Sequence, residues 1–380
     1  MKTQLSREFQ VFVKPVGAEC NLSCQYCYYL VKSDMYQSDG LTRMPDTILE
    51  KYVIQLIGAT TDKNIFFSWH GGEPTLAGLD FFRRAVSLQK KHKPAGYNII
   101  NGLQTNATLL NDDWCRFLSE EGFLVGVSMD GPERLHNKFR VSKGQRGSFK
   151  KTLGGYEMLR KHGVQPELLT VVNADNVNYP AELYRFLKSL GPEYITFLPL
   201  VKEEKNSSSG VSSISVPTEA FGIYLCTIFD EWVSRDIGRI KIQIIEEAAR
   251  TAFNQEHTLC IFKESCGGVP VVEHNGDFYS CDHYVNKEHL IGNINTMSLS
   301  EMLESGRQID FGTAKHTALP QYCIDCEVIE MCNGECPKNR FMYTPSGEPG
   351  LNYLCTGYKR FFTHIRPFID AISIEWSQRS

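Results

Sequence analysis

The sequence predicts an α/β fold built on a parallel sheet, followed by a smaller cysteine-rich region. Over roughly the first 200 residues, short apolar runs alternate with longer segments of helical periodicity, the pattern of parallel strands joined by covering helices. Eight of the thirteen cysteines lie after residue 255. At 380 residues the chain is long enough for two or three domains.

Six strands are expected from runs rich in β-branched and aromatic residues. The runs are 9–14, 64–69, 97–103, 124–128, 167–172 and 194–198. The intervening helices are expected at 47–57, 81–91, 112–120, 151–161 and 181–189. Several of these segments end at a glycine, as helices often do. Six such strands form either an open doubly wound sheet or a partial barrel.

A polar segment at 202–217 breaks this alternation and carries Ser207-Ser208-Ser209-Gly210 at its middle. It is interpreted either as a solvated connector or as a lid over the active site. A helical run at 218–234 follows and closes the first domain. The expected division is therefore 1–235 and 236–380, the second part ending in a helix and containing a hairpin that turns at Asn275-Gly276.

Composition points to a soluble cytoplasmic protein. The net charge of −4 gives no reason to expect binding to nucleic acid, which usually requires an excess of basic residues. The N-terminus lacks the apolar core of a signal peptide, and no apolar stretch approaches the ~20 residues that span a membrane. In a reducing compartment the cysteines indicate metal ligation or redox chemistry rather than disulfides. Cys115 and Cys226, which stand alone in helical patterns, are expected to be small buried hydrophobes.

Three of the cysteines, Cys20, Cys24 and Cys27, follow the first expected strand. Their spacing suits a tight loop around one corner of a four-iron cluster. A closed cluster takes four thiolates, so three leave one iron open, as catalytic metal sites do for a substrate. A zinc site is the alternative, although zinc would require a fourth local Cys or His.

This C-x3-C-x2-C spacing, with Tyr26 before the last cysteine, resembles the radical S-adenosylmethionine (SAM) superfamily. The resemblance implies a partial (β/α)6 barrel and a [4Fe–4S] cluster whose open iron binds SAM. Reductive cleavage of SAM then yields methionine and a 5′-deoxyadenosyl radical.

Cofactor contacts are implied at the ends of later strands, where barrel active sites are built. Glycines at 71 and 72 let the backbone approach a ligand, a tight turn without a ligand being the alternative. A hydroxyl suits a ribose or carboxylate, and a guanidinium suits a carboxylate. The residues implied to bind the cofactor are Tyr26, Gly71, Gly72, Glu73, Ser128, Arg140 and Leu200.

The eight C-terminal cysteines make two complete sets of four, as two closed four-iron clusters need. Zinc ribbons are the alternative. The joint spacing resembles the SPASM extension of radical SAM enzymes, a small α+β domain with two auxiliary clusters for electron transfer and structural support. The resemblance assigns Cys260, Cys266, Cys281 and Cys336 to one cluster and Cys323, Cys326, Cys332 and Cys355 to the other. An exchange of Cys332 and Cys336 stays open.

The stretch 279–285, in which Asp282 follows Cys281, is similar to the anaerobic sulfatase-maturating enzymes. The similarity implies that the radical removes a Cβ hydrogen from a cysteine or serine of an unfolded sulfatase polypeptide. Asp282 would be the base and Gln104 would position the peptide. The implied product is Cα-formylglycine, and the second electron leaves through the auxiliary clusters. A flavodoxin or ferredoxin is the expected electron donor.

Two other functions compete with this one. Maturases that form thioethers or other crosslinks in ribosomal peptides share both domains, but often add an N-terminal peptide-binding domain, and only about a dozen residues precede the first expected strand here. A non-catalytic iron–sulfur or zinc protein is disfavoured by the missing fourth ligand near Cys20. His283 is expected to be structural. The sequence does not distinguish a cysteine from a serine target, and it does not identify the substrate protein, the reductant or the oligomeric state.

Overall fold

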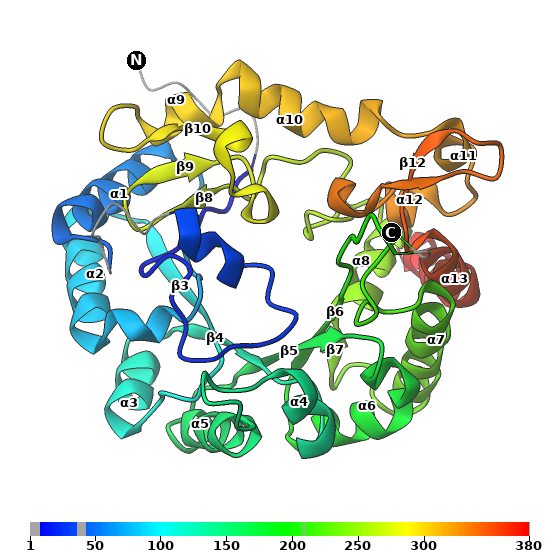
Figure 1. Cartoon of the computed structure of the whole chain (residues 1–380), viewed down its shortest axis with the longest axis horizontal. Helices are drawn as coiled ribbons and strands as arrows, with labels where there is room; N and C mark the ends of the chain where they lie inside the picture. Colours follow the sequence, from blue (N-terminus) through cyan, green and yellow to red (C-terminus); the bar gives the residue numbers. More distant parts are fainter. Residues whose placement is uncertain (1–7, 36–42, 208–209, 380) are drawn as a thin grey trace. The chain divides into compact units, whose positions relative to one another are not determined.

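The computed structural model describes residues 8–35, 43–207 and 210–379, and its contacts divide the chain into two compact units (Figure 1). Unit 1 comprises Met1–Ser128, Asn137–Pro166 and Gly267–Gly312. Unit 2 comprises Met129–His136, Glu167–Cys266 and Thr313–Ser380. The division into domains near residue 235 stays a prediction.

Unit 1 contains a mixed sheet with the strand order β10-β9-β8-β1-β2-β3-β4. Strands β1 to β4 are parallel, and β8 pairs with the other edge of β1 in parallel. Strand β9 is antiparallel to both of its neighbours, β8 and β10. The strands are β1 (Phe12–Val13), β2 (Asn64–Trp69), β3 (Asn98–Thr105), β4 (Leu124–Ser128), β8 (Val271–Val272), β9 (Asp277–Tyr279) and β10 (Leu290–Asn293).

The expected hairpin at Asn275-Gly276 is confirmed, because β8 and β9 pair there and Gly276 has φ +90°. This positive φ favours glycine. Through β8 the hairpin extends the sheet of the N-terminal strands, so that Gly267–Gly312 belong to the same unit as the first cysteine loop.

Helices cover the outer side of the unit 1 strands in Figure 1. Trp69, the last residue of β2, is fully buried beneath these helices and packs edge-on against Tyr52 of α1 and Phe81 and Phe82 of α2. Its indole Nε1 donates to Asn101 Oδ1 at 2.8 Å, so the buried polar atom is satisfied. The helices are α1 (Asp46–Ala59), α2 (Leu79–His92), α3 (Asp112–Glu120), α5 (Phe149–Lys161) and α9 (Leu299–Leu303).

Unit 2 contains the parallel strands β5 (Glu167–Val172), β6 (Tyr194–Pro199) and β7 (Lys241–Ile242) and the hairpin β11 (Met342–Tyr343)–β12 (Pro349–Leu351). Its longest helices, α7 and α13, lie side by side (Figure 1). The helices are α6 (Pro180–Ser189), α7 (Thr218–Arg235), α8 (Gln243–Ala252), α11 (Gln321–Ile324), α12 (Ile329–Cys332) and α13 (Cys355–Arg379).

Two helices, α4 (Glu133–Phe139) and α10 (Gly306–Thr317), have residues in both units. Short 3-10 turns lie at Leu30–Met35, Pro74–Ala77, Asn176–Asn178, Asp282–Tyr284, Lys287–His289 and Pro337–Asn339. In the described part of the chain, no helix is both long and apolar enough to cross a membrane.

The expected strands and helices of the first 200 residues are present, and each end lies within three residues of its predicted position. Helix α4 was not predicted, because its seven residues are too few for a clear helical period. The polar segment at 202–217 is closed by a bridge between Glu203 and Val211, and residues 208 and 209 lie outside the described residues.

Candidate active site and cluster sites

Three of the predicted ligands, Cys20, Cys24 and Cys27, lie on one loop of unit 1. Backbone hydrogen bonds hold this loop: Ser23 N donates to Val141 O at 2.7 Å, and Gln25 N donates to Phe139 O at 3.1 Å. Burial, with smaller effects of Glu73 and the nearby Cys24 and Cys27, raises the pKa of the Cys20 thiol to about 12. The structure therefore brings the three thiols together.

The glycine pair after β2 packs directly on the backbone that leads into Cys20. A Cβ on Gly71, whose φ is +132°, would lie 2.9 Å from the carbonyl oxygen of Gly17, and one on Gly72 would lie 2.0 Å from that of Glu19. Gly72 N also donates to Gly17 O at 2.9 Å. Close approach of two backbones thus requires glycine at both positions.

Glu73 connects the ends of β2 and β3. Its buried carboxylate accepts hydrogen bonds from Thr75 N (3.1 Å), Thr75 Oγ1 (2.7 Å), Thr105 Oγ1 (2.7 Å) and Asn106 N (2.7 Å). Asn106 Nδ2 in turn reaches Asn21 Oδ1 at 3.0 Å and Cys20 Sγ at 3.8 Å. Asn106 had no assigned role from the sequence, although a polar residue directly after β3 could have been recognised as a candidate site residue.

Other predicted contacts lie in two pairs within unit 1. Gln104 Nε2 donates to Ser128 Oγ at 3.1 Å. The Arg140 guanidinium lies 5.5 Å from the centre of the Tyr26 ring. Leu200 belongs to unit 2, where it follows β6 as expected and its N donates to Val172 O at 2.8 Å.

Asp282, the predicted base, lies in a buried ionic cluster. It is 8% exposed, and its Oδ1 is 2.5 Å from Nζ of Lys14, which is 1% exposed. The hydroxyl of Tyr28 donates to its other oxygen. Burial is the largest single effect and raises the pKa of Asp282, but the Lys14 ammonium and the smaller effects of neighbouring groups together outweigh it and hold the pKa well below the usual range of a carboxyl. The carboxylate is therefore ionised at neutral pH.

Aromatic groups complete this cluster. His70 stacks on Phe12 at 4.0 Å between ring centres, and burial lowers its pKa to about 3, so the imidazole is uncharged at neutral pH. His283 packs against the Tyr28 ring at 4.9 Å, which fits its expected structural role. Lys14, Tyr28 and His70 had no assigned role from the sequence; the signal for Lys14 was a charged residue ending an apolar strand.

Seven of the eight C-terminal cysteines belong to unit 2, whereas Cys281 follows β9 in unit 1. One cavity is lined by Cys323, Cys326, Cys332 and Cys355, the four thiols of one predicted set. The other three unit 2 thiols, Cys260, Cys266 and Cys336, all act electrostatically on Lys315.

The donor arrangement can be compared with the two candidate metals. Within the described ranges, no group of three or more His, Cys, Asp or Glu side chains is placed to hold a metal ion. A zinc ion draws its thiolates to about 2.3 Å, whereas a four-iron cluster is a wider body whose ligands stand farther apart. The four-cysteine cavity offers the number of thiolates that a closed four-iron cluster takes.

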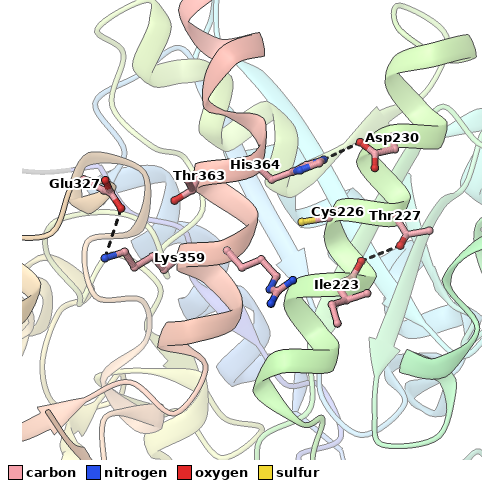
Figure 2. A pocket seen from close by; sticks show the side chains of 9 residues that line it. Ile223, Cys226, Thr227, Asp230, Glu327, Lys359, Thr363 and His364 are labelled. Carbon is pink, nitrogen blue, oxygen red and sulfur yellow. Dashed lines mark hydrogen bonds and ion pairs between the residues drawn. The ribbon is translucent and has the colours of Figure 1, made fainter. Parts of the chain in front are cut away.

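An open groove of about 620 Å³ lies between α7 and α13 (Figure 2). His364 on α13 contacts Asp230 on α7 at 2.7 Å, and Lys359 pairs with Glu327 at 3.5 Å. Cys226 lines this groove and is half-buried, contrary to the expected burial, whereas Cys115 is fully buried. None of the predicted catalytic or cofactor-binding residues lines the groove; it shares only Lys359 with the four-cysteine cavity.

Comparison with known proteins identifies the family. Residues 15–187 match the radical SAM superfamily, and residues 260–327 match the SPASM iron–sulfur cluster-binding domain. A serine-type anaerobic sulfatase-maturating enzyme of Bacteroides thetaiotaomicron is 43% identical over 97% of this chain and 92% of its own length. The chain belongs to the anaerobic sulfatase-maturating enzyme family.

Other members of the family are also similar over nearly the whole chain. The serine-type enzyme of Klebsiella aerogenes is 36% identical and covers 95% of this chain and 87% of its own. The cysteine-type enzyme of Clostridium perfringens strain 13 is 32% identical, with coverage of 94% and 96%. The solved structure "Native anSMEcpe with bound AdoMet and Cp18Cys peptide" superposes with a TM-score of 0.86 at 30% identity and covers 97% of this chain and 100% of that one.

These comparisons confirm the predicted fold class, a radical SAM α/β domain followed by a SPASM domain. The chain is a radical SAM anaerobic sulfatase-maturating enzyme. Its radical SAM domain uses SAM and a four-iron cluster, and its SPASM domain binds auxiliary iron–sulfur clusters.

Proposed function

We propose that this enzyme oxidises Cβ of a serine or cysteine in an unfolded sulfatase polypeptide to Cα-formylglycine, with Asp282 as the base. The observation that carries the proposal is the contact of the buried Asp282 with the buried Lys14 and with the hydroxyl of Tyr28, in the same unit as the Cys20–Cys27 loop. A carboxylate held ionised beside a radical-generating loop is suited to take a proton from a substrate as it is oxidised.

Cys20, Cys24 and Cys27 would hold the first cluster, and the cofactor would contact Tyr26, Gly71, Gly72, Glu73, Ser128, Arg140 and Leu200. When bound, SAM and this cluster supply the radical that removes one hydrogen atom from Cβ. The Arg140 side chain on the Tyr26 ring provides a cation for the methionyl carboxylate. Glu73 keeps the glycine loop in place through its hydrogen bonds to the end of β3.

The oxidation removes two electrons in separate steps. Cβ would lose a hydrogen atom, and the hydroxyl or thiol would lose its proton to Asp282. The auxiliary clusters, when held by their thiolates, would supply an acceptor for the remaining electron. Serine then becomes an aldehyde directly, and cysteine becomes a thioaldehyde that water hydrolyses. Lys14 stabilises the ionised form of Asp282 before the reaction, and Gln104 would hold the peptide backbone by its amide.

Each auxiliary cluster would have four thiolates, in the sets Cys260, Cys266, Cys281, Cys336 and Cys323, Cys326, Cys332, Cys355. The cavity that the second set lines supports this assignment. A flavodoxin or ferredoxin would deliver the first electron.

Serine is the better-supported target. The serine-type relatives from Bacteroides thetaiotaomicron and Klebsiella aerogenes are 43% and 36% identical to this chain, and the cysteine-type relative from Clostridium perfringens is 32% identical. Sequence identity over the whole chain does not identify the residues that select the target, so the test compares a peptide with serine and a peptide with cysteine at the target position.

The test is mass spectrometry of paired sulfatase peptides that differ only in Ser or Cys at the target, incubated with reduced enzyme and SAM. The expected result is an aldehyde from the Ser peptide and 5′-deoxyadenosine in equal amount. Asp282→Asn should lose the aldehyde while still forming 5′-deoxyadenosine. A crosslinked peptide would favour a thioether-forming maturase, and absence of 5′-deoxyadenosine would contradict the radical reaction altogether.

A further inference from the structure

Lys315 on α10 is a buried cation at one group of auxiliary thiols. Its side chain is 1% exposed, and its Nζ donates to the carbonyl oxygens of Cys260 at 2.9 Å, Ile261 at 2.8 Å and Lys263. An ammonium has three N–H donors and no acceptor, so three carbonyls select its charged form. The thiols of Cys260, Cys266 and Cys336 lie within electrostatic range of it.

Arg340 lies between the two groups of unit 2 thiols. The thiols within its electrostatic range are Cys266 of one predicted set and Cys323 and Cys332 of the other. Its guanidinium donates to the carbonyl oxygens of Lys315 (2.5 Å), Asn333 (2.9 Å), Gly334 (2.8 Å) and Glu335 (3.1 Å).

The surrounding residues are arranged for this guanidinium. Gly334 has φ +67°, and a Cβ there would lie 2.6 Å from Arg340 Nη2. Any larger residue at position 334 would therefore clash with the Arg340 guanidinium. The nearby acid, Glu335, is buried and accepts hydrogen bonds from the amides of Asn339 at 2.9 Å and Asn352 at 2.6 Å. The hydrogen bonds from Arg340 to backbone oxygens satisfy its N–H groups without cancelling its charge.

We propose that Lys315 and Arg340 are positioning residues that form a cationic bridge, which raises the reduction potential of the auxiliary clusters. Lys315 acts on one cluster, and Arg340 acts on both. The inference rests on the proposed function and its two ligand sets. A cluster held by four thiolates is anionic, and each added electron makes it more so. A buried cation therefore favours the reduced state, and net charge is one of the determinants of cluster potential.

A raised reduction potential of the auxiliary clusters would affect the transfer of the second electron of the reaction. Clusters of higher potential accept an electron from the substrate more readily. Carbonyl contacts from Lys315 to the Cys260 loop and from Arg340 to the Asn333–Glu335 loop also hold the two ligand loops in one frame.

The experiment is a redox titration of the auxiliary clusters in full-length enzyme whose Cys20, Cys24 and Cys27 are replaced by alanine, so that the first cluster does not contribute. In this background Lys315→Met and Arg340→Gln remove the charge, and Lys315→Arg and Arg340→Lys keep it. Lys359→Met is the matched control, because Lys359 is also near an auxiliary thiol, Cys326, but its side chain is 41% exposed and water screens it. Iron content is measured for each variant, and paramagnetic resonance spectra distinguish the two clusters.

At a fixed ambient potential, the ratio of reduced to oxidised cluster should fall about tenfold in the neutral variants, equivalent to about 59 mV for a one-electron couple. The fall should affect one cluster in Lys315→Met and both in Arg340→Gln, and it should be small in the charge-keeping variants and in Lys359→Met. Loss of iron from the neutral variants alone would also support the bridge, because it would show that the enzyme retains its clusters only when the positive charge is present.

Unchanged potentials in fully loaded neutral variants would overturn the proposal. Equal shifts in Lys359→Met, equal shifts in the charge-keeping variants, or loss of iron from the charge-keeping variants would overturn it as well. The titration needs no peptide, so failure to oxidise sulfatase peptides together with a normal titration would contradict only the proposed function.

Discussion

At the scale of single residues, the base candidate depends on a partner far away in sequence. Asp282 lies in a site where burial opposes its charge, and the Lys14 ammonium at 2.5 Å is the largest of the effects that together outweigh burial. Lys14 also lies 4.3 Å from the centre of the Tyr29 ring, whose hydroxyl donates to Glu273. Lys14 therefore contacts both Asp282 and the Tyr29 ring, so its replacement tests whether the ion pair is needed for the reaction.

Lys14→Met should lower peptide oxidation about 100-fold, the order expected when a positioned general base is lost, while 5′-deoxyadenosine is still formed. Removing the cation leaves a buried carboxylate without its partner. Lys32→Met is the comparison: Lys32 donates to the carbonyl of Val285 at 2.8 Å and acts on Asp282 electrostatically, so its replacement should lower peptide oxidation much less than Lys14→Met does. Product and 5′-deoxyadenosine are quantified together, and an unchanged product yield would show that Asp282 needs no ion pair.

Glu247 makes a pH-dependent contribution to stability. It is 3% exposed and accepts hydrogen bonds from His257 at 3.1 Å and from the backbone of Thr258 and Leu259 at 3.0 Å, just before Cys260. Burial raises its pKa, but these donors outweigh burial and lower the pKa below its usual value. A lowered folded-state pKa contributes stability above the unfolded value, and the contribution is lost as the pH falls through the folded value.

Glu247→Gln should therefore lower the free energy of unfolding by about 1–3 kcal/mol at neutral pH. The difference from the parent enzyme should narrow below about pH 4, where the unfolded carboxyl protonates. Urea unfolding at a series of pH values measures both quantities. A difference that stayed constant across the series would mean that the carboxylate charge makes no contribution.

At the scale of elements, α7 and α13 approach closely because each carries a glycine at the contact. A Cβ on Gly357 would lie 2.4 Å from the carbonyl oxygen of Thr218, and one on Gly222 would lie 2.8 Å from that of Gly357. Phe221 and Tyr358 then pack edge-to-face at 5.5 Å beside the crossing. Since α13 begins at Cys355, this contact also places a predicted cluster ligand.

Gly357→Ala should destabilise the enzyme by about 1–3 kcal/mol, because the added methyl group forces the helices apart. Gly154→Ala is the matched control: Gly154 lies within α5 and a Cβ there meets nothing within 4 Å. That change should be neutral or stabilising by about 0.5–1 kcal/mol, since alanine favours a helix over glycine. Denaturant melts compare them, and equal effects would refute the close-contact explanation.

At the scale of the whole molecule, the part of unit 2 between α10 and α13 is poor in regular structure. Helices α11 and α12 have four residues each, too few to be stable alone. Four thiols around one cavity join these turns to the start of α13. Bound clusters would therefore supply stability that the small amount of secondary structure does not.

Removal of iron by an anaerobic chelator should thus raise amide hydrogen exchange across residues 321–354 and leave α5 protected. The exchange is measured by mass spectrometry on the loaded and the iron-free enzyme. Cys115→Ser, which alters a buried thiol outside the predicted sets, should leave the exchange of residues 321–354 in the loaded enzyme unchanged. Protection of that segment after iron removal would show that side-chain packing alone maintains it.

The sequence by itself determined the order of strands and helices and the family. Strand and helix periods are local, so β2, β4 and α3 could be predicted to the residue. Cysteine spacing is also readable in one dimension, because loop ligands of a cluster lie close together along the chain. Of the residues named by family resemblance, those of the glycine loop, Ser128 and Leu200 could likewise be assigned to strand ends from the sequence alone.

Only the tertiary structure decided what surrounds those residues. Tyr28 and Asp282 are 254 positions apart and meet because β8 pairs with β1 and carries the hairpin to the first cysteine loop. The same pairing brings Lys14 to Asp282, while the position of Arg340 between two thiol groups follows from helix and loop packing. Such contacts depend on strand register and close packing over long sequence separations, which leave no local pattern in the chain.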